Sequence, residues 1–474
     1  MESSRESSDD MNRTNSNSNT TCSKTKSISF DVFENCLAKL INFYCYDDCK
    51  SYIVVQPNAS ELDVKYIDNQ ISYQDFVVQF LIPNLPCKFA SHFTESWRSR
   101  KEWVNSEMKP NFSFLKEHFG MATVPVADCS QKVYNSQHKQ EMYLKSYINY
   151  LETVKENDWD FTSKPCLYLK DWHFVRDFPG YSAYTTPIFF TSDWLNEYWK
   201  KRTDECDDYQ FVYLGPKGSW YTMEMLSINL DSLFSFECDV FGSYSWSANV
   251  CGKKKWLLFP PGDEENLVDW KGEMAYDISS PLLKDKNCYP KASKLQRIGI
   301  EIIQEAGEVV FVPSGWFHQV WNLEDTISIN HNWMNGFNLH LIWKNLFQAL
   351  NSVEKEISDC KDMEGWSDHC QVVLKAHHGM NFKEFVEMLD CVGQRAAADV
   401  ENFSQIKEAP SLHHYPWHSV LDLVLVVQGL KLVLKHPKIS SDLFRTTSEL
   451  LLQLQSTIQK VEHESSSKLL KKLI

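Results

Sequence analysis

The residues with the clearest chemical potential lie in one segment, Glu305–Val320, with the sequence EAGEVVFVPSGWFHQV. The pattern predicts a strand, a Pro-Ser-Gly turn and a second strand entered through Trp316 and His318. The turn would direct the imidazole of His318 into the mouth of a barrel, where a neutral ring nitrogen can bind a metal. A single histidine in a strand is more often structural than a ligand. Whether His318 binds a metal therefore has to be judged from other motifs in the chain.

Motifs on both sides of this segment occur together in one known family. They are SANVCGKKKWLLFPPG at 247–262 and EDTISINHNW at 324–333. Together with EAGEVVFVPSGWFHQV they resemble the JmjC family of iron(II)- and 2-oxoglutarate-dependent oxygenases, over about residues 73 to 333. The resemblance implies a double-stranded β-helix, which is a cupin-type barrel, with Fe(II) as cofactor and 2-oxoglutarate and O₂ as cosubstrates.

The family holds iron with two histidines and one carboxylate, leaving positions open for 2-oxoglutarate and O₂. The resemblance places Asp239 at the carboxylate and His318 at the distal histidine. The first histidine, two positions before the carboxylate, is replaced by Glu237, and no histidine occurs between His173 and His318. Alternate residues of a strand share a face, so Glu237 would point the same way as Asp239. No catalytic residue beyond this metal site is expected.

An insertion precedes the altered motif. Family members reach the metal motif within a few residues of Gly218-Ser-Trp220, whereas Tyr221–Phe236 (YTMEMLSINLDSLFSF) intervenes here. Three interpretations are open: a misplaced exon boundary, a genuine Glu237/Asp239/His318 site, or a protein that has lost iron binding.

The cosubstrate side of the predicted site keeps more of the family pattern. Lys254 falls where the family places the lysine that binds the distal carboxylate of 2-oxoglutarate, and along a strand it shares a face with Trp256. Its two neighbours in the Lys-Lys-Lys run would then face outward. Asn330 and Ser247 match positions where relatives carry further polar pocket residues.

The resemblance extends to one branch of the family through PNLPC at 83–87, LYLKDW at 167–172, SDWLNE at 192–197 and NHNWMNGFN at 330–338. Members of that branch hydroxylate a lysine of a translation release factor, which implies a lysyl hydroxylase with a protein partner. Histone demethylation uses the same chemistry and is an alternative, although no zinc-finger or chromatin-reader spacing is found. A catalytically inactive barrel that binds a protein partner is the second alternative, and it rests on Glu237.

The sequence patterns of the segments that must position these residues predict a mainly β protein with flanking helices. Residues 1–28 are rich in Ser, Asn and Thr and are expected to form a disordered tail. Residues 29–119 are expected to form a helical segment leading into the barrel, 120–335 the JmjC double-stranded β-helix, and 336–474 a helical region.

Local patterns support this division. Ser72 with Asp75 is typical of a helix start, and Asn338 could cap a helix whose apolar residues recur at helical spacing. Short β-type runs alternate with turn residues in the middle region, at 123–126, 166–169, 210–214, 244–250, 255–259, 309–312 and 326–330.

The amino-acid composition limits the kinds of partner that the protein is expected to bind. The 474 residues include 48 basic and 63 acidic ones, a formal charge of −15, which disfavours direct binding of nucleic acid. Most of the 14 cysteines should be buried, reduced thiols, which indicates a cytoplasmic protein, with the nucleus as an alternative location. The apolar run Val420–Leu434 is interrupted by polar residues, so no membrane partner is expected. The C-terminal apolar stripes could pack within one chain or form a homodimer.

Overall fold

The computed structural model describes residues 30–45, 63–68, 71–133, 136–203, 208–222, 239–272, 274–278, 280–295, 299–402 and 416–464. The tail predicted over 1–28, the candidate ligand Glu237 and all but the first two residues of the 221–236 insertion lie outside these ranges.

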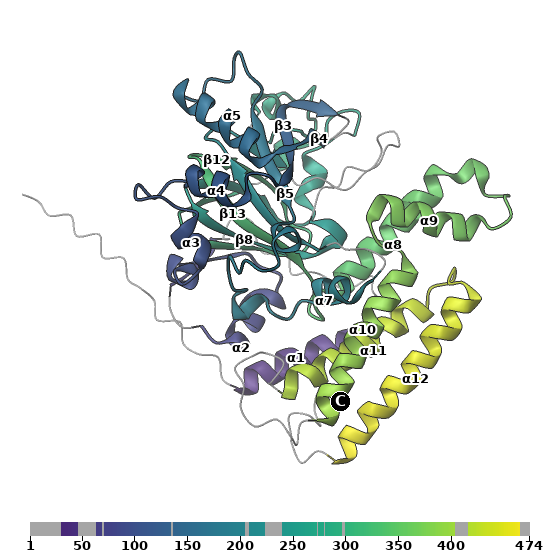
Figure 1. The fold of residues 1–474 in the computed structure, drawn as a ribbon. Coiled ribbons are helices and arrows are strands. Elements are labelled where there is room, and N and C mark those ends of the chain that lie inside the picture. Colours follow the sequence, from purple (N-terminus) through teal and green to yellow (C-terminus); the bar gives the residue numbers. More distant parts are fainter. Residues whose placement is uncertain are drawn as a thin grey trace, which may run out of the picture.

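Two sheets face each other and form the predicted barrel (Figure 1). The larger sheet has the strand order β1-β2-β11-β8-β13-β6-β5-β3-β4, and the smaller has the order β10-β9-β12-β7. The double-stranded β-helix predicted from the resemblance is therefore confirmed. The strands are β1 (Lys65–Ile67), β2 (Cys87–Phe89), β3 (Thr123–Val133), β4 (Ser136–Tyr143), β5 (Leu167–Trp172), β6 (Gln210–Gly215), β7 (Trp220–Thr222), β8 (Tyr244–Cys251), β9 (Lys254–Phe259), β10 (Ile300–Gln304), β11 (Val309–Val312), β12 (Phe317–Asn322) and β13 (Thr326–Trp333).

The two central strands of the larger sheet, β8 and β13, are buried along their whole length. Their outward side chains are large and apolar and join the main core, as Tyr244, Trp246 and Trp333 illustrate. Phe190 stacks on Trp246 at a ring-centroid distance of 5.5 Å, so aromatic packing holds the outer face of the sheet. The inner face of these strands is left for the interior of the barrel.

Short helices flank the barrel, and one of them starts as its sequence predicts. The Ser72 hydroxyl accepts a hydrogen bond from the Asp75 backbone N–H, and the Asp75 carboxylate accepts one from the Ser72 backbone N–H. This capping box begins α2, which continues into one π-helical stretch over 77–81. The helices before α8 are α1 (Phe30–Cys45), α2 (Tyr73–Phe76), α3 (Arg98–Glu102), α4 (Phe112–Phe119), α5 (Leu144–Glu156), α6 (Phe174–Asp177) and α7 (Trp194–Lys201).

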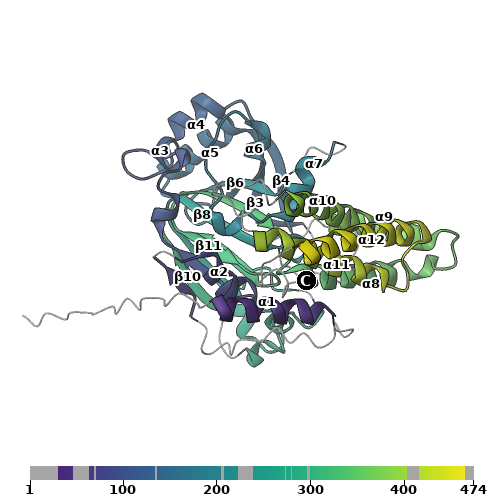
Figure 2. The same cartoon turned by 90° about the horizontal axis from the view of Figure 1, so that it is seen from below.

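The C-terminal helices form a bundle beside the barrel, and α1 lies against it (Figure 2). The ring of Phe33 in α1 meets that of Trp417 edge-to-face at 5.0 Å. The bundle consists of α8 (Leu339–Glu356), α9 (Trp366–His378), α10 (Phe382–Glu401), α11 (Pro416–Leu434) and α12 (Ser441–Glu464). Helix α11 is long and apolar enough to cross a membrane, but 83% of Trp417–Leu434 is buried inside the protein. Its apolar surface is thus used as the core of the bundle.

One detail of the helical prediction is wrong. Asn338 precedes α8, but its side chain does not cap that helix. Its Oδ1 accepts the Asn335 backbone N–H at 3.0 Å, and its Nδ2 donates to Ser314 Oγ at 2.9 Å. The neighbouring Asn335 N–H therefore takes the oxygen that a cap would need, and the amide nitrogen bonds to the barrel rim.

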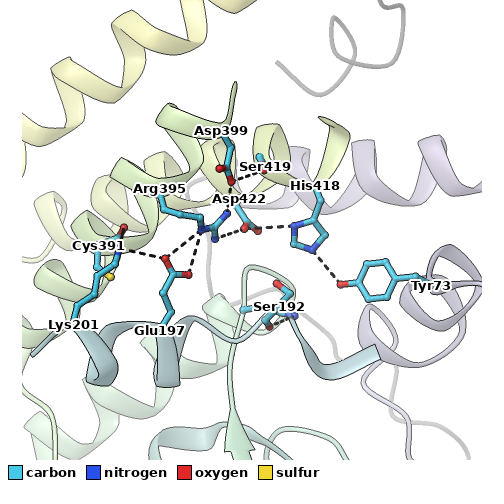
Figure 3. Close-up of polar contacts among 11 residues, drawn as sticks. Tyr73, Ser192, Glu197, Lys201, Cys391, Arg395, Asp399, His418, Ser419 and Asp422 are labelled. Atoms are coloured by element: carbon cyan, nitrogen blue, oxygen red, sulfur yellow. Dashed lines mark hydrogen bonds and ion pairs between the residues drawn. The ribbon is translucent and has the colours of Figure 1, made fainter. Parts of the chain in front are cut away.

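A partly buried ionic network joins the bundle to the barrel's flank (Figure 3). Arg395 of α10 contacts Glu197 of α7 at 3.2 Å, Asp399 at 3.4 Å and Asp422 of α11 at 2.8 Å. Helix α7 in turn meets the end of β13, because the Trp194 backbone N–H donates to the carbonyl of Met334, the residue after that strand, at 2.8 Å. The network fixes α10 and α11 relative to the strand that lines the barrel.

Candidate active site

The inner face of the barrel carries small polar side chains at every second position of its central strands. Strand β8 contributes Ser245, Ser247 and Asn249, and β13 contributes Ser328, Asn330 and Asn332. The two sets lie opposite each other, since Asn330 pairs with Ser247 and Asn332 with Ser245. All six side chains are buried. Burying uncharged hydroxyl and amide groups costs free energy unless they form hydrogen bonds with the protein or a ligand. A buried surface lined with so many of them therefore indicates a binding site.

Asp239 lies at one end of this surface, just before β8, and is 1% exposed. Its Oδ2 accepts a hydrogen bond from Ser245 Oγ and its Oδ1 one from Asn332 Nδ2, each at 2.8 Å. Burial raises the pKa of Asp239 above its usual value, whereas the electrostatic interaction with His318 and the two hydrogen bonds act in the opposite direction. The carboxylate is therefore oriented from two strands and electrostatically coupled to His318.

His318 enters the barrel from the opposite sheet. It lies on β12, directly across from Leu258 of β9, and is 1% exposed. Its Nδ1 lies 3.0 Å from the Trp316 carbonyl, so this nitrogen carries the proton and Nε2 is left as the electron-pair donor. A fixed tautomer of this kind is typical of histidines that bind metals.

Lys254 begins β9 and its side chain is completely buried, as the resemblance implies. Its Nζ donates to Ser328 Oγ at 2.6 Å. Burial lowers the pKa of this amine from 10.5 to about 7. The outward orientation predicted for Lys253 and Lys255 is confirmed, because they form surface ion pairs with glutamates at 3.0 and 2.7 Å.

Two polar atoms between these ends have no hydrogen-bond partner. They are Ser247 Oγ and Asn330 Oδ1, both buried. Asn330 Nδ2 makes a long contact of 3.5 Å with Ser328 Oγ. Orphaned polar atoms in a buried, polar interior are what a pocket for a polar ligand leaves behind when the ligand is absent.

Strand β13 connects the two ends of the site. Ser328 accepts a hydrogen bond from Lys254, and Asn332 donates one to Asp239. Asn330 lies between Ser328 and Asn332 on the same face of the strand. Four residues of a strand span about 13 Å, which is enough for an extended five-carbon dicarboxylate bound by a cation at one end and a metal at the other. The residues present thus fit 2-oxoglutarate.

The metal side is less complete. Asp239 and His318 interact electrostatically, but no group of three metal-ligating side chains occurs among the described residues. A third protein ligand would have to come from outside these ranges, where Glu237 lies. Among the described residues, Asp239 and His318 are thus candidates for two of the three ligands that iron needs in this type of site.

The residues that orient these groups were not singled out from the sequence. Ser328 hydrogen-bonds to Lys254, and Ser245 and Asn332 hydrogen-bond to Asp239. Tyr213 lies near Lys254. The Lys254 ammonium lies 6.0 Å from the centre of the Tyr213 ring, and the Tyr213 hydroxyl donates to Asp171 at 2.7 Å. The alternation of small polar and large apolar residues in YSWSANVC and TISINHNW was the signal that could have found the first three.

Known proteins share both the motifs and most of the chain. A family model described as JmjC domain, hydroxylase, matches residues 225–333. The proteins named 2-oxoglutarate and iron-dependent oxygenase JMJD4 are 48% identical in Danio rerio, over 73% of this chain and 80% of that protein, and 49% identical in Homo sapiens, over 68% and 74%. A protein of Arabidopsis thaliana named Arginine-specific demethylase JMJ20 is 40% identical, over 67% of each chain. This chain therefore belongs to the JmjC family of iron- and 2-oxoglutarate-dependent oxygenases, and within it to the JMJD4 type.

Proposed function

We propose that this chain is a protein lysyl hydroxylase that acts on a translation release factor with Fe(II), 2-oxoglutarate and O₂. The observation that carries the oxygenase part is the single barrel interior that holds Lys254 at one end and the Asp239–His318 pair at the other. The substrate part rests on the resemblance to the lysyl-hydroxylating branch of the family.

The roles of the individual residues follow from their environments. Lys254 would bind the distal carboxylate of 2-oxoglutarate, since a buried ammonium is a strong partner for a buried anion. Ser247 and Asn330 would orient the cosubstrate between the ends of the site. Asp239 and His318 would hold the iron through the carboxylate and Nε2. Iron bound together with 2-oxoglutarate supplies the oxidising power to hydroxylate an unactivated C–H bond.

Glu237 determines whether the chain as written turns over. A glutamate offers a carboxylate oxygen on a more flexible side chain in place of an imidazole nitrogen, and it adds negative charge to the site, so we expect weak iron binding and slow or no turnover. Glu237→His should restore turnover if this ligand alone is at fault.

The test compares three proteins: the chain as written, its Glu237→His variant, and a chain without Tyr221–Phe236 that carries histidine at this position. Each is loaded with Fe(II) without oxygen, and 2-oxoglutarate-dependent succinate release is measured after oxygen is admitted. Equal rates from the first two proteins would show that Glu237 is a competent ligand. No succinate from any of the three would overturn the oxygenase proposal.

The substrate is tested separately. A basic protein surface suits a chain of formal charge −15, and a lysine side chain fits that complementarity. A recombinant release factor incubated with the active variant should gain the mass of one oxygen atom on a lysine, in a 2-oxoglutarate-dependent manner. A release factor that stays unmodified while succinate is produced would exclude it as the substrate. A translation substrate would also place the enzyme in the cytoplasm.

A demethylase is the second candidate, and it is favoured by one observation. The Arabidopsis relative that is 40% identical to this chain is named an arginine-specific demethylase. Hydroxylation of an N-methyl group releases formaldehyde, so methylarginine peptides offered to the same enzyme would distinguish the two functions by loss of a methyl group.

A further inference from the structure

Two cysteines lie opposite each other where β3 meets the start of β5. The antiparallel register pairs Ala127 with Tyr168 and Asp128 with Leu167, and its next step places Cys129 opposite Cys166. The Cys129 backbone N–H donates to the Cys166 carbonyl at 2.8 Å, which confirms this extension of the register. Opposite residues of antiparallel strands have Cα atoms about 4.5 to 5.5 Å apart and side chains on one face. That separation lies within the range of a disulfide, about 4.4 to 6.8 Å.

The two thiols also point at each other. A hydrogen bond with Cys166 lowers the pKa of Cys129, against the opposing effect of burial, and the same bond raises the pKa of Cys166. The positive charge of Lys170 lowers the pKa of Cys129 further. Cys129 is thus the thiol that ionises first, and Cys166 is placed as its partner.

We propose that Cys129 and Cys166 form a reversible disulfide in the native barrel when the protein meets hydrogen peroxide. The Cys129 thiolate attacks one peroxide oxygen, which breaks the O–O bond, releases hydroxide and leaves a sulfenic acid. The Cys166 sulfur then attacks the Cys129 sulfur, forms the S–S bond and displaces the hydroxyl group, which leaves with the Cys166 proton as water. Two sulfur atoms are oxidised by one electron each, and one peroxide is reduced.

Oxidation changes the link between the two sheets. The Cys129 thiol donates to the carbonyl of Trp220 in β7 at 3.2 Å, and a disulfide has no proton to donate. The Trp220 carbonyl keeps its other donor, Gln137 Nε2, at 3.1 Å. The disulfide would also close the chain around β4 and α5. The pair therefore exchanges one contact between the sheets for a covalent bond within the larger sheet.

The test is peptide mapping of the folded full-length chain after graded hydrogen peroxide and blocking of the remaining thiols. We expect a cross-linked peptide containing Cys129 and Cys166, lighter by two hydrogen atoms than the two reduced peptides, and its disappearance after dithiothreitol. Exposed Cys360 serves as an internal control, because its oxidation shows that the oxidant acted.

Matched variants separate this pair from general oxidation. Cys129→Ser should abolish the cross-link and leave Cys166 as a free thiol, whereas Cys251→Ser, at another buried cysteine, should leave the cross-link intact. The oxidised wild-type protein should also melt at a higher temperature than the reduced one, and Cys129→Ser should lose that shift. If both thiols stay reduced while Cys360 is oxidised, or if either pairs mainly with a different cysteine, the proposal is overturned.

Discussion

Replacement of Lys254 by methionine should weaken 2-oxoglutarate binding and stabilise the protein without ligand. The side chain is fully buried, and its ammonium is placed to meet the distal carboxylate of 2-oxoglutarate. Loss of a buried charge-assisted interaction costs roughly 2 to 4 kcal/mol. The dissociation constant for 2-oxoglutarate should therefore rise by about 30- to 1000-fold.

The stabilisation follows from the depressed pKa of the same amine. The pKa of Lys254 falls from 10.5 to about 7 on folding, so the folded state binds this proton more weakly than the unfolded state does. The resulting penalty is fully present below pH 7 and disappears as the pH rises to 10.5. At pH 7.5 it amounts to about 4 kcal/mol, and methionine would remove it while losing about 1 kcal/mol from the hydrogen bond to Ser328. We expect Lys254→Met to raise the free energy of unfolding by at most about 3 kcal/mol.

The assay is calorimetric titration with 2-oxoglutarate in the presence of Mn(II), together with urea unfolding of the ligand-free protein at pH 7.5. Lys255→Met is the matched control, because Lys255 is the next residue, faces outward and pairs with Glu301 at 2.7 Å. Since affinity and stability should change in opposite directions, misfolding cannot imitate the result. A dissociation constant for Lys254→Met within about twofold of the wild-type value would refute the assignment.

Three further predictions follow from the described contacts. Lys254 must be protonated to bind an anion, and its pKa is about 7. The affinity for 2-oxoglutarate should therefore be constant below pH 7 and fall about tenfold per pH unit above it. An affinity that stays constant up to pH 9 would contradict this. Asn332→Ala removes a donor from the Asp239 carboxylate and should weaken Mn(II) binding by about 10- to 100-fold in a metal titration, and unchanged affinity would show that Asn332 does not position this ligand. Arg395→Met leaves the buried carboxylate of Asp422 without its guanidinium partner and should lower the free energy of unfolding by about 3 kcal/mol in urea. Arg445→Gln, at an exposed ion pair, should cost less than about 0.5 kcal/mol.

The sequence was sufficient to predict the barrel and the ends of the site. Each β-type run that it marked in the middle region lies in a strand, except that 166–169 begins one residue before β5, because alternating apolar residues and Gly or Pro turns are local signals that the fold obeys. Lys254 could be told from its two lysine neighbours for a similar reason, since strand alternation sends adjacent side chains to opposite faces. The family resemblance then selected which face was the interior.

Other features depend on residues far apart in the chain, so no local pattern could predict them. Asn338 has the right type and place to cap α8, but its amide nitrogen bonds to Ser314, 24 residues away, and its oxygen accepts the nearby Asn335 N–H. Arg395 looks like an ordinary charged residue of an amphipathic helix, and only the folded bundle shows that it meets three carboxylates (Figure 3).

The sequence by itself thus determined the family, the barrel and the identity of Lys254, Asp239 and His318 as candidates, because motif and strand alternation are written in neighbouring residues. The tertiary structure alone decided which side chains orient them. Ser328 lies 74 residues from Lys254 and Asn332 lies 93 residues from Asp239, and they meet because β13 runs between β6 and β8 along the interior of the barrel. The same cross-strand geometry brings Cys129 to Cys166, since strand pairing depends on register and not on closeness in sequence.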